Sequence, residues 1–363
     1  MRPFIVAVTL FIAALLTAEC APANRPPAIT VAGVPAILFA EGKLWIRRPG
    51  WTDFFPATSG IRVEPGVEVQ PGNGTRAIVL CSNFISQQLP SDITSQLAGN
   101  CAAGPKLLPD AGLGPMLGSN PTGIPYVISP RRTRLFSSTP LLRWHAAEGA
   151  SFYTACLRPI GDQCIWKTQT AGTQIRYPGD PPLLPGKAYI LEITTDNRRT
   201  SAEDVAPNIE FQVIQPGERE YIDAAVALLQ SAPLADAERI FAIAQFYAAQ
   251  ELRSDALEAI DELERTDVSL PRLSLLAGDL YRQSSLPIEA ADAYVQAAEL
   301  AASPALEDAE AAAQARMALG AVYVELGDVE TAIAAYQAAR ELFTRLGDNA
   351  GVTKVNEELK QLE

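Results

Sequence analysis

Residues 319–339 read LGAVYVELGDVETAIAAYQAA, and this stretch decides the fold of the C-terminal part of the chain. Its large and small apolar residues recur at helical spacing, and an internal glycine divides it into two helices. The residues that define the pattern are Leu319, Gly320, Tyr323, Gly327, Ala332, Tyr336 and Ala339.

Two earlier stretches follow the same order of large and small residues. The middle copy consists of Leu276, Ala277, Tyr281, Ser285, Ala290, Tyr294 and Ala297. The first, more degenerate copy consists of Ile243, Ala244, Tyr247, Glu251, Ala256, Ile260 and Leu263. The leading apolar residues of the three copies lie 33 and then 43 residues apart, so an insertion, residues 302–310, is expected to lengthen two helices of the second step.

The three copies resemble tetratricopeptide repeats (TPR). The resemblance implies an all-α solenoid over residues 217–363, in which stacked helix pairs share one core because no pair can bury its apolar face alone. Residues 220–230 are expected to form a leading helix and residues 352–362 a solvating cap. The fold class is therefore multidomain α and β, with this TPR solenoid at the C-terminal end.

The TPR resemblance also implies a binding site for a protein or peptide segment in the concave groove, on the first helix of each pair. Its inward positions fall on Glu238, Phe241, Gln245, Ser274, Arg282, Gln283, Gln314, Met317, Val324 and Glu325. This mixed apolar and acidic set favours a basic or amphipathic segment. It lacks the Lys/Asn cluster with which TPR chaperone cofactors hold a C-terminal carboxylate.

The charge of the chain is unevenly distributed. The whole chain has a formal net charge of −13, but residues 217–363 hold 27 acidic and 11 basic side chains, a net charge of −16, which leaves +3 for the remainder. An acidic repeat region argues against nucleic acid as its ligand. It indicates either a solvated acidic surface or a basic partner.

Residues 1–23 have the pattern of a signal peptide for export. Arg2 supplies the positive end, residues 4–16 the apolar run, and residues 21–23 a small-residue cleavage site. An alternative is lipid attachment at Cys20, because residues 16–20 resemble a bacterial lipobox, although Glu19 departs from it. No second apolar run is long enough to span a membrane, so the expected location is the periplasm, cell envelope or extracellular space.

Four cysteines, Cys81, Cys101, Cys156 and Cys164, remain once the signal is removed. An even number in an exported chain predicts disulfide bonds. Cys156 and Cys164 bracket a turn-forming run and are expected to bridge a hairpin, which leaves Cys81 to pair with Cys101. Zinc is disfavoured because the spacings do not fit and His145 is the only histidine, so neither a metal nor a cofactor is predicted.

Residues 36–90 are predicted to form a small β domain. Apolar residues alternate with polar ones in short runs, and Pro-Gly pairs separate the runs. The runs 42–45, 60–63, 65–69 and 75–80 resemble the FecR-like β domain of exported bacterial proteins, with a departure at Val67, where that family carries Asp. The resemblance implies a structural or sensing module without a catalytic centre.

Residues 126–215 carry a second β pattern after a Gly/Pro-rich linker, residues 91–125. The strand spacing resembles an immunoglobulin or fibronectin type III β sandwich, which implies that Trp144 and Tyr189 lie in its core. Arg131, Arg132 and Arg134 form a basic cluster at its entrance. A solvated edge is the expected role of this cluster, with anion or polysaccharide contact as the alternative.

These observations predict an exported, non-enzymatic adaptor that holds another protein in its TPR groove. No nucleophile accompanies His145, and the sequence contains no G-x-S-x-G or H-E-x-x-H motif. Two alternatives remain open. In the first, the chain is a structural spacer of the cell envelope whose solenoid packs against its own β domains or self-associates. In the second, its β domains bind carbohydrate through Trp45, Trp51 or Trp166.

Overall fold

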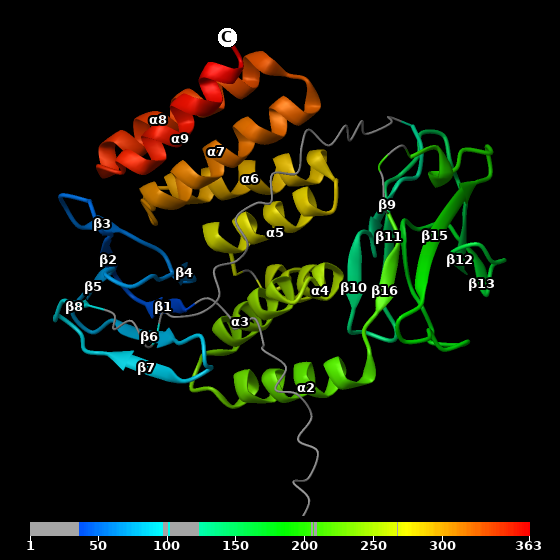
Figure 1. Ribbon diagram of the computed structural model, residues 1–363, viewed down its shortest axis with the longest axis horizontal. Helices are drawn as coiled ribbons and strands as arrows, with labels where there is room; N and C mark the ends of the chain where they lie inside the picture. The colour runs from blue at the N-terminus through cyan, green and yellow to red at the C-terminus, as the bar shows by residue number, and fades with distance from the viewer. Residues whose placement is uncertain (1–35, 97–100, 102–122, 205, 207–208, 267) are drawn as a thin grey trace, which may run out of the picture. The chain divides into compact units, whose positions relative to one another are not determined.

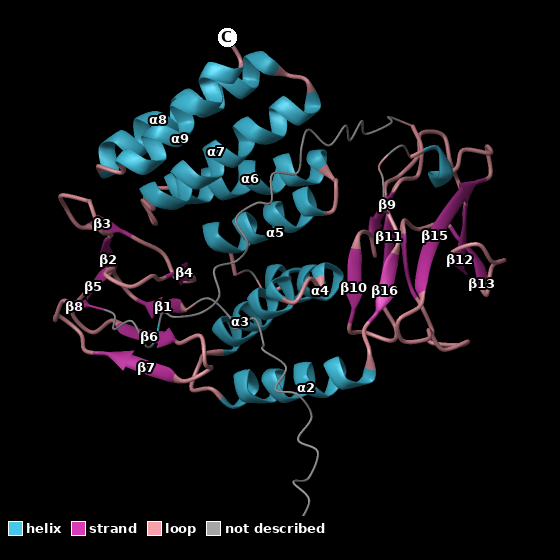
Figure 2. Ribbon diagram, in the orientation of Figure 1, coloured by secondary structure: helices cyan, strands magenta, loops and turns pink. Residues whose placement is uncertain are grey.

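The computed structural model describes residues 36–96, 101, 123–204, 206, 209–266 and 268–363. These residues belong to one compact unit, Ala32–Glu363, drawn in Figures 1 and 2. The predicted signal peptide with Cys20, and most of the predicted linker 91–125, lie outside the described residues. No helix in the described part of the chain is both long and apolar enough to cross a membrane.

The N-terminal region folds into two four-stranded sheets, as its alternating pattern predicts. One has the order β4-β1-β6-β7 and the other β3-β2-β5-β8. The strands are β1 (Ile37–Glu41), β2 (Leu44–Arg47), β3 (Phe55–Pro56), β4 (Ile61–Arg62), β5 (Glu68–Pro71), β6 (Arg76–Leu80), β7 (Ser86–Leu89) and β8 (Ser95–Gln96). Gly50 and Gly66, from two of the Pro-Gly pairs, have φ values of +92° and +91°, which turns favour and other residues rarely adopt.

The second β region also consists of two sheets, with the orders β10-β16-β15-β12-β13 and β14-β11-β9. Trp144 and Tyr189 are buried in the apolar cluster of this region, as predicted. The strands are β9 (Val127–Ser129), β10 (Thr133–Leu135), β11 (Leu141–Trp144), β12 (Tyr153–Pro159), β13 (Trp166–Thr170), β14 (Gln174–Arg176), β15 (Ala188–Thr195) and β16 (Phe211–Val213), with a 3₁₀ turn, η1 (Ser201–Glu203). Both predicted disulfides, Cys81–Cys101 and Cys156–Cys164, are present.

The C-terminal region is entirely helical in its described residues, consistent with TPR-like helix pairs (Figure 2). The helices are α2 (Pro216–Ser231), α3 (Asp236–Ala249), α4 (Arg253–Glu264), α5 (Pro271–Gln283), α6 (Pro287–Ala302), α7 (Ala309–Leu326), α8 (Val329–Leu346) and α9 (Asn349–Gln361). The pairs are α3/α4, α5/α6 and α7/α8, with α2 leading and α9 closing the series. The insertion forms the connection between α6 and α7 as well as lengthening both helices.

A glycine–tyrosine contact recurs inside the later pairs and corrects the register of the middle copy. Gly320 on α7 lies against the ring of Tyr336 on α8, and Gly278 on α5 lies in the same way against Tyr294 on α6. Gly278 is therefore the counterpart of Gly320, whereas the sequence alignment placed Ala277 there. The two positions differ because the sequence pattern matched Leu276 to Leu319, whereas Ala277, the residue before Gly278, is the counterpart of Leu319.

Replacing Gly320 by Ala should destabilise the protein, because a Cβ at this position would lie 2.5 Å from the ring of Tyr336. Overpacking of this kind costs about 1–3 kcal/mol, which outweighs the gain of about 1 kcal/mol in helix propensity. Gly217→Ala is the matched control, since its Cβ would meet nothing within 4 Å. Thermal unfolding should show a lower midpoint for Gly320→Ala only; equal midpoints would contradict the packing argument.

Candidate functional site

The inner face of α3, where the sequence places the start of the partner groove, is covered by the chain's own N-terminal β region. Phe241 is 0% exposed, and its ring lies edge-on to Phe39 of β1 with centroids 6.0 Å apart. The turn at Gly60 also lies against this ring. Phe241 therefore belongs to a hydrophobic core shared by β1, β6 and the first helices, and is not available to a second protein in this arrangement.

Arginines of the β region bind the polar residues on either side of Phe241. Arg62 of β4 donates from Nη2 to Oε1 of Gln245 at 3.0 Å. Arg76 of β6 donates from Nη1 to both carboxylate oxygens of Glu238 at 3.0–3.1 Å, and from Nη2 to the carbonyl of Pro233. All three groove positions nominated on α3 thus have partners within the same chain.

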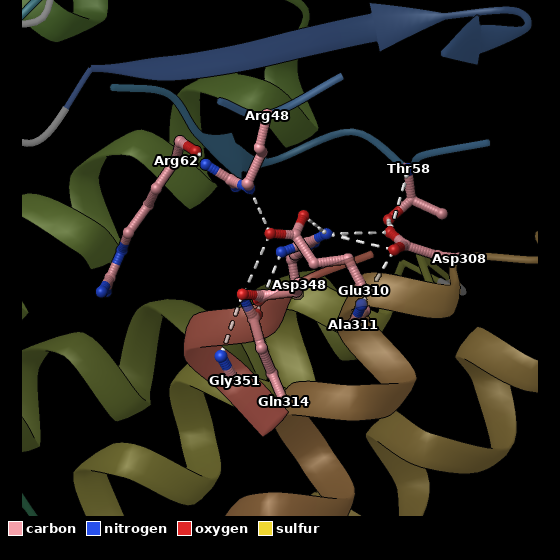
Figure 3. A network of polar contacts seen from close by, with 10 residues as sticks. Arg48, Thr58, Arg62, Asp308, Glu310, Ala311, Gln314, Asp348 and Gly351 are labelled. Carbon is pink, nitrogen blue, oxygen red and sulfur yellow. Dashed lines mark hydrogen bonds and ion pairs between the residues drawn. The ribbon is translucent and has the colours of Figure 1, made fainter. Parts of the chain in front are cut away.

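A buried ionic network connects the β region to the start of α7 (Figure 3). Arg272 on α5 is 7% exposed and pairs with Asp308 at 3.1 Å and with Glu310 at 3.0 Å. From the β region, Thr58 donates its N–H and hydroxyl to Asp308 at 3.0 and 2.7 Å, and Arg48 pairs with Glu310. Five side chains from four segments therefore pair their charges largely out of water, and Nε of Arg272 is the buried donor of this network that has no partner among the described residues.

Asp308 has two roles in this network. Its Oδ1 accepts from the N–H of Ala311 at 2.9 Å, so it is also the N-cap of α7. Burial alone would raise its pKa, but Arg272 and the N–H groups of Ala311 and Thr58 outweigh burial and lower the pKa below its ordinary value. The carboxylate is thus ionised at neutral pH and joins the start of α7 to the β region.

The other nominated groove residues lie on α5 and α7 in several different environments. Ser274 is buried, and Gln314 accepts from Arg272 at 3.2 Å. Met317 is partly buried against the core that the β region shares with α8. Arg282 pairs with Glu325 at 2.9 Å, and Gln283 accepts from Arg253 at 3.3 Å. Val324 is 36% exposed and is the apolar member of the set with the most accessible side chain.

The basic cluster at the entrance of the β sandwich is not a solvated edge, and that prediction is wrong. Arg131 is buried, pairs with Asp204 at 2.5 Å and donates to the carbonyl of Ser284 at the end of α5. Arg132 and Arg134 bind Ser285 and Glu218 of the helical region. The three arginines join the sandwich to the helices, a role that sequence proximity could not reveal because their partners lie 73–153 residues away.

Three carboxylates on one face of α4 complete the contact with the sandwich. Asp255 accepts from the N–H groups of Phe136 and Ser137 at 3.0 and 2.9 Å. Glu258 accepts from the N–H of Leu141 and from Arg176, and Asp261 pairs with Arg143. Their three-residue spacing places them on one side of the helix. Burial raises the pKa of Asp255 to about 6, although both N–H donors favour its ionised form.

The tryptophans proposed for carbohydrate binding are not prominent on the surface. Trp51 is buried, and Trp45 and Trp166 are half-buried. His145 stacks on Tyr126 with ring centroids 4.6 Å apart. The described residues contain no group of three or more His, Cys, Asp or Glu side chains placed to hold a metal ion.

No family model matches the chain, and no curated protein matches it. Among solved structures, BtubC (BKLC) from P. vanneervenii is 22% identical over 41% of this chain and 66% of its own, with a TM-score of 0.35. MamA is 18% identical over 41% of this chain and 95% of its own, with a TM-score of 0.28. The assignment of TPR-like pairs therefore depends on the sequence pattern and helix packing of this chain.

Phe241→Ala should destabilise the whole chain, because the side chain fills the core between α3 and the β region. The expected cost is about 3–5 kcal/mol. Val324→Ala, at an exposed position nominated for the same groove, should change stability by less than about 0.5 kcal/mol. Urea unfolding of both variants checks the difference; a Phe241→Ala protein as stable as the wild type would show that this core does not form.

The raised pKa of Asp255 predicts that its contribution to the free energy of unfolding increases as the pH falls. Its folded pKa of about 6 exceeds the ordinary value of 3.8, so between these values the folded state holds more protons than the unfolded state. Stability from this group therefore rises as pH falls through 6, by up to about 3 kcal/mol. Asp255→Asn should lose this component between pH 7 and 5 in urea unfolding, whereas the exposed Asp292→Asn should retain it; identical pH profiles would refute the assignment.

Proposed function

We propose that this chain is an exported, non-enzymatic scaffold whose helical repeats hold its own two β domains in fixed positions and offer the assembled surface to protein partners. The observation that carries the proposal is the occupied inner face of α3, where Glu238, Phe241 and Gln245 bind Arg76, Phe39 and Arg62. It develops the spacer interpretation of the sequence. The two disulfides support export, because oxidising compartments preserve such bonds.

The face of the N-terminal β region that covers α3 has the chemical character that the groove residues predict for a ligand. The sequence favours a basic or amphipathic segment, and the β face supplies Arg62, Arg76 and Phe39. An external segment would compete with a ligand tethered at an effective concentration in the millimolar range. It would also have to replace the ion pairs between the β region and the helices, Arg76–Glu238 and Arg48–Glu310.

The adaptor that holds a basic or amphipathic protein segment in its groove is the second candidate function. It is favoured by Val324, a nominated groove residue with an exposed side chain. Val324 directly precedes Glu325, which pairs with Arg282. In this case a partner binds either at that end of the face or after the β region leaves. The two candidates differ in whether release of the β region exposes new binding capacity.

The test of the scaffold is the variant Arg48→Glu/Arg76→Glu, which places like charges opposite Glu310 and Glu238. Repulsion at both contacts should release the β region from the helices and increase the radius of gyration measured by small-angle X-ray scattering. Lys43→Glu/Lys354→Glu is the control, because it changes the net charge equally at exposed positions and should leave the radius unchanged.

The two candidate functions are separated by using the wild type, the Arg48→Glu/Arg76→Glu variant (the released variant) and the control variant to capture proteins from the cell envelope. The scaffold predicts capture by the wild type and the control, and loss of capture by the released variant because the assembled surface is gone. Capture by the released variant alone would favour the groove adaptor. An unchanged radius in the released variant would contradict the fixed contact on which the scaffold depends.

A further inference from the structure

The five-stranded sheet of the second β region has two edge strands, β10 and β13. β10 contacts the helices, and β13 lies at the opposite end of the strand order. At the first edge, the N–H of Arg134 in β10 donates to the carbonyl of Glu251 at 3.2 Å. The opposite edge is β13, whose only strand neighbour in the described residues is β12. An edge strand of this kind presents backbone N–H and C=O groups that can pair with another chain.

A recess of about 560 Å³ lies on the outer face of the sheet beside this edge. The turn between β12 and β13 bounds it, and the Cys156–Cys164 disulfide holds that turn to the sheet. The recess is lined by Thr154, Cys156, Arg158, Gln163, Cys164, Lys167, Glu192 and Thr194. Because no aromatic side chain lines it, ring stacking on a sugar is not available there.

The charges in the recess leave one cation in excess. Arg158 pairs with Glu192 at 3.3 Å. Lys167 is exposed, and no carboxylate of the described residues forms an ion pair with it. In the turn between β12 and β13, Ile160 is 51% exposed, and its N–H donates to the carbonyl of Ala188, the first residue of β15, at 3.2 Å. The recess and the turn that bounds it therefore combine an unpaired cation with an accessible apolar side chain.

We infer that the edge of β13 and its recess bind an extended segment of another protein in which acidic and apolar residues alternate. Pairing along β13 would place successive side chains of the segment on opposite faces of the sheet. On the outer face they would lie beside Lys167, which favours a carboxylate. On the inner face they would lie beside the half-buried Trp166 and Thr168, which favours an apolar side chain.

This inference specifies the partner class of the proposed scaffold, but its test leaves the contact between β region and helices untouched. The full chain is titrated with a labelled peptide of alternating glutamate and valine, and binding is measured by fluorescence anisotropy. Lys167→Glu should weaken binding by at least about tenfold, Lys167→Arg should retain it, and raising the salt concentration should weaken it. Lys354→Glu, an exposed lysine on α9, is the matched control and should bind as the wild type does.

Three results would overturn the inference. One is no binding of the glutamate–valine peptide at millimolar concentration; another is equal binding of a lysine–valine peptide. The third is equal loss of binding in Lys167→Glu and Lys354→Glu, which would indicate non-specific attraction. Circular dichroism of each variant verifies folding. If the peptide does not bind but Arg48→Glu/Arg76→Glu still increases the radius of gyration, the scaffold proposal stands and only the docking edge on β13 is refuted.

Discussion

Burial of Arg272 between Asp308 and Glu310 is the constraint on which the arrangement of β region and helices depends. A guanidinium removed from water must be paired, and each carboxylate that pairs with it must in turn find further donors. Asp308 finds them in Ala311 and Thr58, and Glu310 finds Arg48. The network thus joins α5, the start of α7 and two turns of the β region, and removal of Arg272 would leave two buried carboxylates without their shared cation.

The apolar contacts extend the same connection along the inner face of the helices. Phe39 and Phe241 meet in a core that contains residues of β1, β6 and the first helices, and a second core contains residues of both sheets of the β region together with α7, α8 and α9. Because both cores combine β and helical residues, the β region acts as the internal ligand of the repeat face. The inner face of α3 is therefore already covered within the chain.

The charge asymmetry of the chain is explained in part by these contacts. The helical region carries the excess of acidic side chains. Arginines of the β strands and turns form ion pairs with some of them, as in Arg76–Glu238 and Arg134–Glu218. On the sandwich side, α4 presents Asp255, Glu258 and Asp261 to backbone N–H groups and arginines. Sequence reasoning detected the asymmetry but assigned it to solvent or to an external basic partner.

Local pattern determined the helical periodicity, the alternating strands and the two disulfides, because periodicity, turn residues and cysteine spacing are short-range properties of the chain. The pairing of the helices and the burial of Trp144 and Tyr189 followed from the resemblance of these patterns to known families. The first two positions of the middle copy were misplaced by one residue, since Ala277 and Gly278 are both small and only the approach of Tyr294 distinguishes them. What the tertiary structure decided is that the N-terminal β region covers the inner face of α3. Thr58 and Asp308 are 250 residues apart, and no sequence pattern specifies which distant surfaces will share a buried charge. That outcome depends on the shapes of the two surfaces and on whether every polar group that the contact removes from water finds a partner.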